Sequence, residues 1–214
     1  VAKTNTLPHF FHYCLQNNLP FAFYRLPETE TIKVVAQKSN KTSPVAGGKS
    51  IAAKKGFLFA PFQENSTFSS LLIQPDIYTT ANKLPELNFA AKSKTAKPAG
   101  NKKLKLKQAT RQQYVAYVKQ IQREIKNGGF TKVVAARVAK KKKPESFNPV
   151  TFFEALCKKY PAAFVSLVYT PQYGLWRGAT PEILLSGDKT TFKTYSLAGT
   201  KTNKAKNAAT AWGK

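Results

Sequence analysis

Two groups of residues in the N-terminal quarter have types and spacing that could bind a phosphate or a metal ion. The run GGKS at residues 47–50 reads like the end of a phosphate-binding loop, but such a loop needs a glycine at position 43, where Ser43 stands. His9, His12 and Cys14 could be metal ligands, but a closed site needs a fourth partner. We therefore interpret the run as a surface loop and assign no metal ion to the three side chains.

Lysine-rich stretches dominate the charge of the chain. Its 214 residues include 35 Lys and Arg against 10 Asp and Glu, a formal net charge of +25. Such a balance suggests nucleic-acid binding, because basic side chains neutralise phosphates. The sequence has neither paired Cys/His zinc spacing nor an RNA-binding aromatic signature. We keep a basic nucleic-acid-binding module and a non-catalytic scaffold as alternatives to an enzyme. Because no nucleic-acid-binding signature is present, we expect no nucleic-acid partner.

The composition is that of a folded protein, with 42% hydrophobic and 12% aromatic residues. No apolar run reaches the roughly 20 residues that cross a bilayer, and no signal peptide is visible. Cys14 and Cys157 lie among apolar residues and are interpreted as free thiols of a reducing compartment. These features predict a cytoplasmic location and no membrane partner. The chain has no methionine, so we expect it to be part of a longer protein or to have altered ends.

The elements that must position any chemistry fall into two segments. Residues 1–108 read as short strands that end in a Lys-rich linker at 92–107; the predicted strands are Phe21–Leu26, Ile32–Gln37, Gly56–Phe62 and Phe68–Gln74. Residues 109–214 begin with a helix that Thr110 and Gln113 cap and that Gly128 ends.

A strand over Lys132–Val138 should follow that helix, and Asn148 with Pro149 should open a second helix that ends before Pro161. Four further predicted strands, with a turn at Gly187 and Asp188, are Ala163–Thr170, Tyr173–Ala179, Glu182–Ser186 and Thr191–Leu197. Because helices precede a strand-rich stretch, the pattern favours the α+β class.

Three short segments of the second part occur in a specific order. They are Phe130–Arg137 (FTKVVAAR), Gly178–Glu182 (GATPE) and Leu197–Thr200 (LAGT), and the aromatic strand Tyr173–Trp176 leads into the second. In this order and spacing the chain resembles the chorismate-binding enzymes, closely over residues 110–214. The resemblance implies their fold, large antiparallel sheets flanked by helices, with only the N-terminal part present. Residues 109–214 would then be the first half of the catalytic region, and residues 1–108 a more variable N-terminal part.

The resemblance also implies roles for individual residues. Lys132 stands where the family's water-activating lysine stands, and a lysine acts as a base only when it is neutral, which burial or nearby positive charge promotes. Glu182 stands at the family's general acid, and a desolvated carboxyl group can hold a proton near neutral pH. The turn Ala198, Gly199, Thr200 would bind a substrate carboxylate through backbone N–H groups.

Two positions favour isochorismate synthase within the resemblance. Relatives that use an amine nucleophile usually carry Gln at the position of Lys132, and aminodeoxychorismate synthases tend to carry a lysine at that of Ala198. Lys132 and Ala198 together therefore point to water as the nucleophile. Salicylate synthase, which also uses water, is the alternative activity. The pathway would be either menaquinone or siderophore synthesis.

The resemblance further implies Mg²⁺ as cofactor, chorismate as substrate and a monomeric complete protein. The family's Mg²⁺-binding glutamates lie mostly beyond the position of Lys214, so we expect this chain to be inactive by itself.

Overall fold

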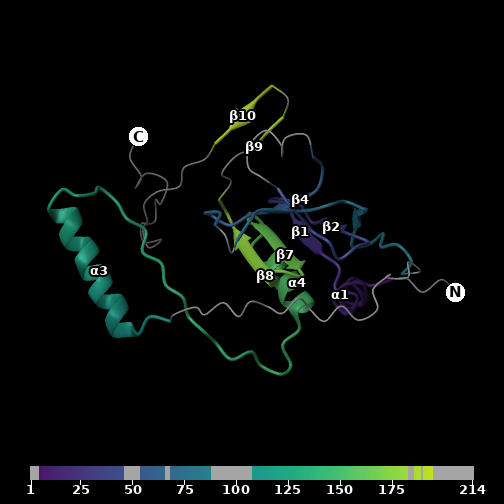
Figure 1. The fold of residues 1–214 in the computed structure, drawn as a ribbon, viewed down its shortest axis with the longest axis horizontal. Coiled ribbons are helices and arrows are strands. Elements are labelled where there is room, and N and C mark those ends of the chain that lie inside the picture. The colour runs from purple at the N-terminus through teal and green to yellow at the C-terminus, as the bar shows by residue number, and fades with distance from the viewer. Residues whose placement is uncertain are drawn as a thin grey trace, which may run out of the picture.

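A five-stranded antiparallel sheet forms the centre of the protein. The computed structural model describes residues 5–45, 54–65, 68–87, 108–182, 186–188 and 190–194. The strand order is β6-β2-β1-β7-β8, and Figure 1 shows the sheet beside its helices. The strands are β1 (Phe21–Arg25), β2 (Ile32–Ala36), β6 (Ile77–Thr80), β7 (Phe164–Thr170) and β8 (Gly174–Thr180). The central β1–β7 pair joins residues from both sides of residue 108. The predicted combination of helices with an antiparallel sheet is confirmed.

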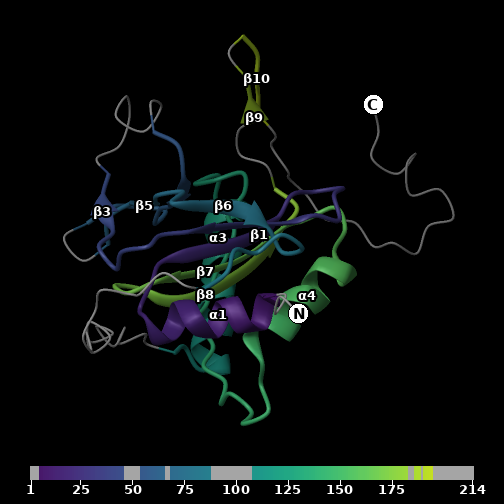
Figure 2. The same ribbon diagram turned by 90° about the vertical axis from the view of Figure 1, so that its right-hand side faces the viewer.

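Two helices cover one face of this sheet, as Figure 2 shows. Helix α1 (Leu7–Gln16) buries Leu7, Phe10, Phe11 and Cys14, a spacing of three and four residues that forms a single helical face. Helix α4 (Pro149–Lys159) begins as predicted, because the Asn148 side chain accepts hydrogen bonds from the N–H groups of Val150 and Thr151.

A second, smaller sheet covers the opposite face. Its order is β3-β5-β4, from β3 (Ser43–Pro44), β5 (Leu71–Ile73) and β4 (Phe57–Phe59). Strand alternation explains the two layers: Phe21 and Phe23 of β1 pack with the helices, whereas Ala22 packs with Val35 and Ile73 toward the small sheet. Three predicted strands are confirmed as β1, β2 and β5 with shorter bounds, and β4 covers part of a fourth.

Arg25 closes the end of β1 as a buried cation that is only 3% exposed. Its guanidinium group donates to five backbone carbonyls at 2.6–3.1 Å, those of Leu26, Thr29, Tyr160, Pro161 and Ala163. Three of these carbonyls belong to the turn that leads from α4 into β7. The arginine therefore fixes that turn against the N-terminal part of the chain.

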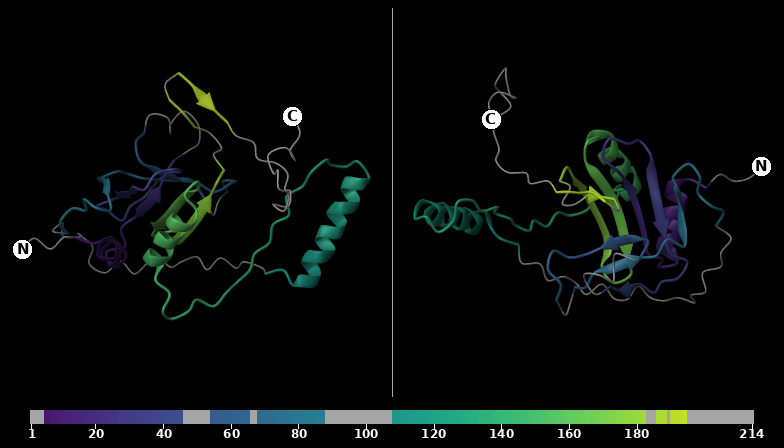
Figure 3. Two further views of the ribbon diagram at one scale, coloured as in Figure 1. Left: turned by 180° about the vertical axis from the view of Figure 1, so that it is seen from behind. Right: turned by 90° about the horizontal axis from the view of Figure 1, so that it is seen from above.

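Helix α3 (Arg111–Lys126) stands apart from the sheet in every view of Figures 1 and 3. Its predicted capping box is present, since Thr110 Oγ1 accepts from Gln113 N–H and Gln113 Oε1 accepts from Thr110 N–H. None of its residues is buried. The helix contacts mainly the segment that follows it: the Arg137 guanidinium lies 5.5 Å from the centre of the Tyr114 ring.

The predicted strand Lys132–Val138 is wrong. This stretch is extended but irregular, and no strand of the described ranges pairs with it. A β-branched run can adopt a ladder only beside another strand, and here its side chains lie largely in solvent. The predicted turn at Gly187 and Asp188 is confirmed, because the Asp188 side chain accepts from the N–H groups of Thr190 and Thr191. It joins β9 (Ser186–Gly187) to β10 (Phe192–Lys193).

No helix in the part of the chain that the structure describes has both the length and the apolar character to cross a bilayer.

Candidate functional site

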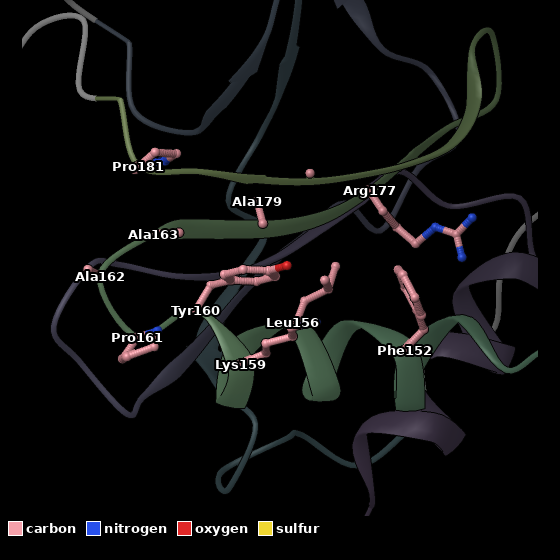
Figure 4. Close-up of a pocket in the computed structure, with 11 residues that line it drawn as sticks. Phe152, Leu156, Lys159, Tyr160, Pro161, Ala162, Ala163, Arg177, Ala179 and Pro181 are labelled. Atoms are coloured by element: carbon pink, nitrogen blue, oxygen red, sulfur yellow. The ribbon is translucent and has the colours of Figure 1, made fainter. Parts of the chain in front are cut away.

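A cavity of about 800 Å³ lies between α4 and β8, as Figure 4 shows. Its floor is one face of α4, its roof is the second half of β8, and the turn between α4 and β7 closes one end. The residues that line it are Phe152, Leu156, Lys159, Tyr160, Pro161, Ala162, Ala163, Arg177, Gly178, Ala179 and Pro181. The cavity is mainly apolar, with two cationic side chains, which is the composition expected of a site for a small anionic ligand.

The floor of the cavity exists because the apolar face of α4 divides in two. Phe152, Leu156 and Tyr160 are spaced by four residues and point toward β8, whereas Phe153, one position on, is fully buried in the core. The sequence pattern places all four within the helix predicted between Asn148 and Pro161. It could not separate them, because the same type of side chain serves the core and the cavity.

Arg177 supplies the positive charge at the roof. Its guanidinium carbon lies 4.5 Å from the centre of the Phe147 ring and 5.3 Å from that of Phe152. These cation–π contacts hold the planar group against both rings. Sequence reasoning did not identify Arg177, although the signal was present: a lone arginine interrupts the apolar run of β8 two residues before Ala179.

Glu182 lies directly beside this cavity in sequence but does not line it. It follows Pro181, the last lining residue, and its N–H donates to the Thr180 side chain at 3.1 Å. The Glu182 side chain is exposed. The predicted acid therefore lies just after the end of β8, outside the cavity. The predicted strand that begins at Glu182 is wrong at this residue, which lies in irregular backbone.

Lys132 lies on a different part of the molecule. It is exposed in the irregular segment that connects α3 to α4, whereas the cavity is built from α4 and β8. Neither Lys132 nor Glu182 lines the cavity, so it does not bring the two predicted catalytic residues together. The third predicted component, Ala198, Gly199 and Thr200, lies outside the described residues, as do the GGKS run and the linker at 92–107.

The other candidate ligands near the N-terminus do not form a metal site. His9 and His12 are on the exposed side of α1, and Cys14 is on the buried side. Burial raises the pKa of the Cys14 thiol to about 12, so it stays protonated and is a poor metal ligand. Across the described ranges, no group of three or more His, Cys, Asp and Glu side chains could hold a metal ion.

Comparison with known proteins identifies the family. The profile of the chorismate binding enzymes matches residues 62–212, a span that includes Lys132, Glu182 and the cavity between α4 and β8. Among curated proteins and among solved structures, no match was found. Since the family profile covers most of the 214 residues, the chain belongs to the chorismate binding enzyme family.

Proposed function

We propose that this protein is an isochorismate synthase, which adds water at C2 of chorismate while the C4 hydroxyl leaves. The observation that carries the proposal is the presence of Lys132 and Glu182, at positions that resemble the family's base and acid, within the span of the family match. A chorismate-using enzyme that employs water needs both groups, because one proton must leave the water and another must reach the departing hydroxyl.

In this proposal Lys132 takes the proton from water at its Nζ atom, and Glu182 gives a proton to the C4 oxygen through its carboxyl group. Both transfers require that water other than the nucleophile is excluded, because a solvated lysine is protonated and a solvated carboxyl group is ionised at neutral pH. Both side chains are exposed in the structure. Catalysis by this pair therefore requires that bound substrate or further polypeptide covers them.

The choice of water over ammonia rests on Lys132 together with Ala198. Amine-using members resemble this chain but usually carry Gln at the first position, and aminodeoxychorismate synthases tend to carry a lysine at the second. An apolar Ala198 offers no nucleophile, which leaves water as the attacking group.

Mg²⁺ is the cofactor that the resemblance implies. The described residues do not fit it, because they contain no group of three or more acidic, His or Cys side chains that could bind a cation. A hard dication takes six or more oxygen ligands, of which carboxylates are the commonest protein source. We therefore assign the two proton transfers to Lys132 and Glu182, and neither transfer to the metal.

The experiment that tests the proposal is product analysis with the complete enzyme, chorismate and Mg²⁺. We expect isochorismate, and we expect Glu182→Gln to lower kcat by roughly 10²–10⁴-fold while KM stays within a few-fold, since the amide is nearly isosteric but cannot donate an acidic proton. Glu145→Gln is the matched control, because Glu145 is also an exposed glutamate, in the α3–α4 connection. Salicylate with pyruvate would identify the other water-using activity, and normal turnover by Glu182→Gln would remove Glu182 from the mechanism.

A further inference from the structure

We propose that helix α3 binds an anionic phospholipid surface, with its apolar side chains among the lipids and its basic side chains at the phosphate groups. In this arrangement the helix lies in the plane of the surface and does not cross the bilayer. The lack of a long apolar run, from which the sequence predicted no membrane partner, bears on crossing and not on surface binding. Neither proposed catalytic residue belongs to α3, so the inference goes beyond the proposed function and does not depend on it.

One face of α3 is apolar, and no layer of the fold covers it. Tyr114, Val118, Ile121 and Ile125 follow at spacings of four and three residues, which places them in one stripe along the helix. None of the helix residues is buried, and the helix stands apart from the sheet in Figures 1 and 3. A helix of 16 residues without tertiary packing is only marginally stable in water, so a surface that covers this stripe would also stabilise the helix.

Exposed apolar side chains extend beyond the stripe. Val115 and Tyr117 border it and are 41% and 46% exposed, and Val134, in the segment after the helix, is 79% exposed. Of the fourteen large hydrophobic side chains that are exposed in the described residues, six lie between Val115 and Val138. Such a concentration of exposed apolar side chains is typical of a surface that binds a partner.

The charge around the apolar stripe is strongly positive. Lys119, Arg123 and Lys126 follow at spacings of four and three residues and form a second stripe, while Glu124 is the one acidic residue of α3. The exposed run Lys140–Lys143 adds four more cations in the connection from α3 to α4. Long basic side chains beside an apolar stripe can reach the phosphate level while the stripe enters the lipid. This charge complements a surface of anionic lipids.

The combination of apolar and basic side chains favours lipid over the other possible occupants. Nucleic acid offers phosphates, but its phosphate backbone does not cover Val118, Ile121 and Ile125. A second copy of the chain would bring the same positive charge to the contact. A protein partner needs a surface of complementary shape, whereas the side chains concerned are spread over a helix and an irregular segment. A fluid lipid surface adapts to both.

The test is co-sedimentation of the protein with vesicles at about 0.15 M salt, where long-range attraction to a basic protein is screened. Vesicles of phosphatidylcholine that contain about 30% phosphatidylglycerol are compared with vesicles of phosphatidylcholine alone. We expect saturable binding to the anionic vesicles and about tenfold weaker binding, or less, to the neutral ones, because each basic side chain near an anionic surface contributes to the attraction.

Two double variants separate α3 from the charge of the whole chain. Lys119→Gln with Lys126→Gln should weaken binding to the anionic vesicles about tenfold or more. The matched control is Lys54→Gln with Lys55→Gln, which removes the same charge from an exposed segment outside α3 and should change binding by less than about threefold.

A second pair of double variants tests the apolar stripe. Ile121→Gln with Ile125→Gln keeps every charge but should also weaken binding about tenfold, because these side chains no longer gain from leaving water. Its control is Leu58→Gln with Phe62→Gln, two exposed apolar residues elsewhere, which should bind like the unaltered protein. Since no residue of α3 is buried and glutamine is a good helix former, the α3 variants should keep the fold, which circular dichroism checks.

Several outcomes would overturn the proposal. They are equal binding to both kinds of vesicle, an equal loss in the two lysine pairs, and full binding by the isoleucine pair. A dimer that the isoleucine pair dissociates in analytical ultracentrifugation would show that a second copy covers the helix. Tighter binding to duplex DNA or to polyglutamate than to the anionic vesicles would assign the helix to one of those polyanions.

The outcome is distinguishable from that of the proposed function. Glu182→Gln should bind the anionic vesicles like the unaltered protein, because Glu182 lies outside α3. Absence of isochorismate formation, with vesicle binding intact, would refute the proposed function alone. Loss of vesicle binding in the lysine and isoleucine pairs, with isochorismate formation intact in solution, would support the inference independently of the activity.

Discussion

Replacement of Arg25 by methionine should destabilise the protein more than any exposed arginine substitution. Arg25 is 3% exposed and donates to five carbonyls through its two terminal nitrogens. Methionine retains much of the volume but donates to none of them. Because three of the carbonyls belong to the turn between α4 and β7, the substitution should loosen the wall of the cavity as well as the end of β1.

The expected loss of stability depends on which hydrogen-bond donors each carbonyl keeps when Arg25 is replaced. The carbonyls of Tyr160, Pro161 and Leu26 each keep a second donor, the N–H groups of Ala163, Glu28 and Thr29 respectively. The carbonyls of Ala163 and Thr29 accept only from Arg25 among the described residues. An unsatisfied buried group costs about 1–3 kcal/mol. Thr29 is exposed, so water can satisfy its carbonyl. The substitution also removes charge-assisted hydrogen bonds, but it removes the cost of desolvating a guanidinium group at the same time. Because these two effects oppose each other, we expect the free energy of unfolding to fall by about 3 kcal/mol.

Urea unfolding followed by circular dichroism measures this loss. Arg123→Met is the matched control, since Arg123 is exposed on α3, and it should change stability by less than about 0.5 kcal/mol. Arg25→Lys should fall between the two, because an ammonium supplies three donors from one atom and cannot reach both the carbonyls that accept from Nη1 and those that accept from Nη2. Similar stabilities for Arg25→Met and Arg123→Met would refute the reasoning that the carbonyl network stabilises the fold.

Two further predictions concern the proposed base and a buried thiol. In the complete enzyme, Lys132→Ala should abolish water addition, and Lys132→Gln should let ammonia compete as the nucleophile; product analysis at high ammonium checks both, and normal isochorismate formation by Lys132→Ala would show that another group activates the water. Burial raises the pKa of Cys14 from 9.0 to about 12, so this group's stabilising contribution is complete below about pH 8 and falls as the pH rises toward 12. The stability difference between the unaltered protein and Cys14→Ala should therefore shrink by about 1.4 kcal/mol between about pH 8 and about pH 10, and a constant difference in urea unfolding would contradict the burial argument.

Local signals in the sequence identified both of the later helices and most of the strands. Thr110 with Gln113, and Asn148 with Pro149, predicted two helix starts that the structure confirms, because a capping side chain bonds to N–H groups only two or three residues away. Three short segments, rather than any property of the fold, pointed to the chorismate binding enzymes, and the family match confirms that much.

Features that depend on distant residues were decided by the tertiary structure. The sequence predicted a strand over Lys132–Val138 from its β-branched side chains, yet a strand needs a neighbour, and no described strand pairs with this stretch. The same limit applies to Lys132 and Glu182, whose separation along the chain leaves their distance in space undetermined by local pattern. Their shared role stays a prediction.

The residues that line the cavity also combine a pattern visible in the sequence with an arrangement that only packing decides. The four-residue spacing of Phe152, Leu156 and Tyr160 was visible in the sequence, but only packing against β8 decided that they line a cavity while Phe153 enters the core. Arg25 and Arg177 are the same residue type, each within a strand-forming run. One is buried against backbone carbonyls and the other lies against two aromatic rings. Three of the five carbonyls that bind Arg25, and both rings that contact Arg177, come from residues more than twenty positions away in the chain.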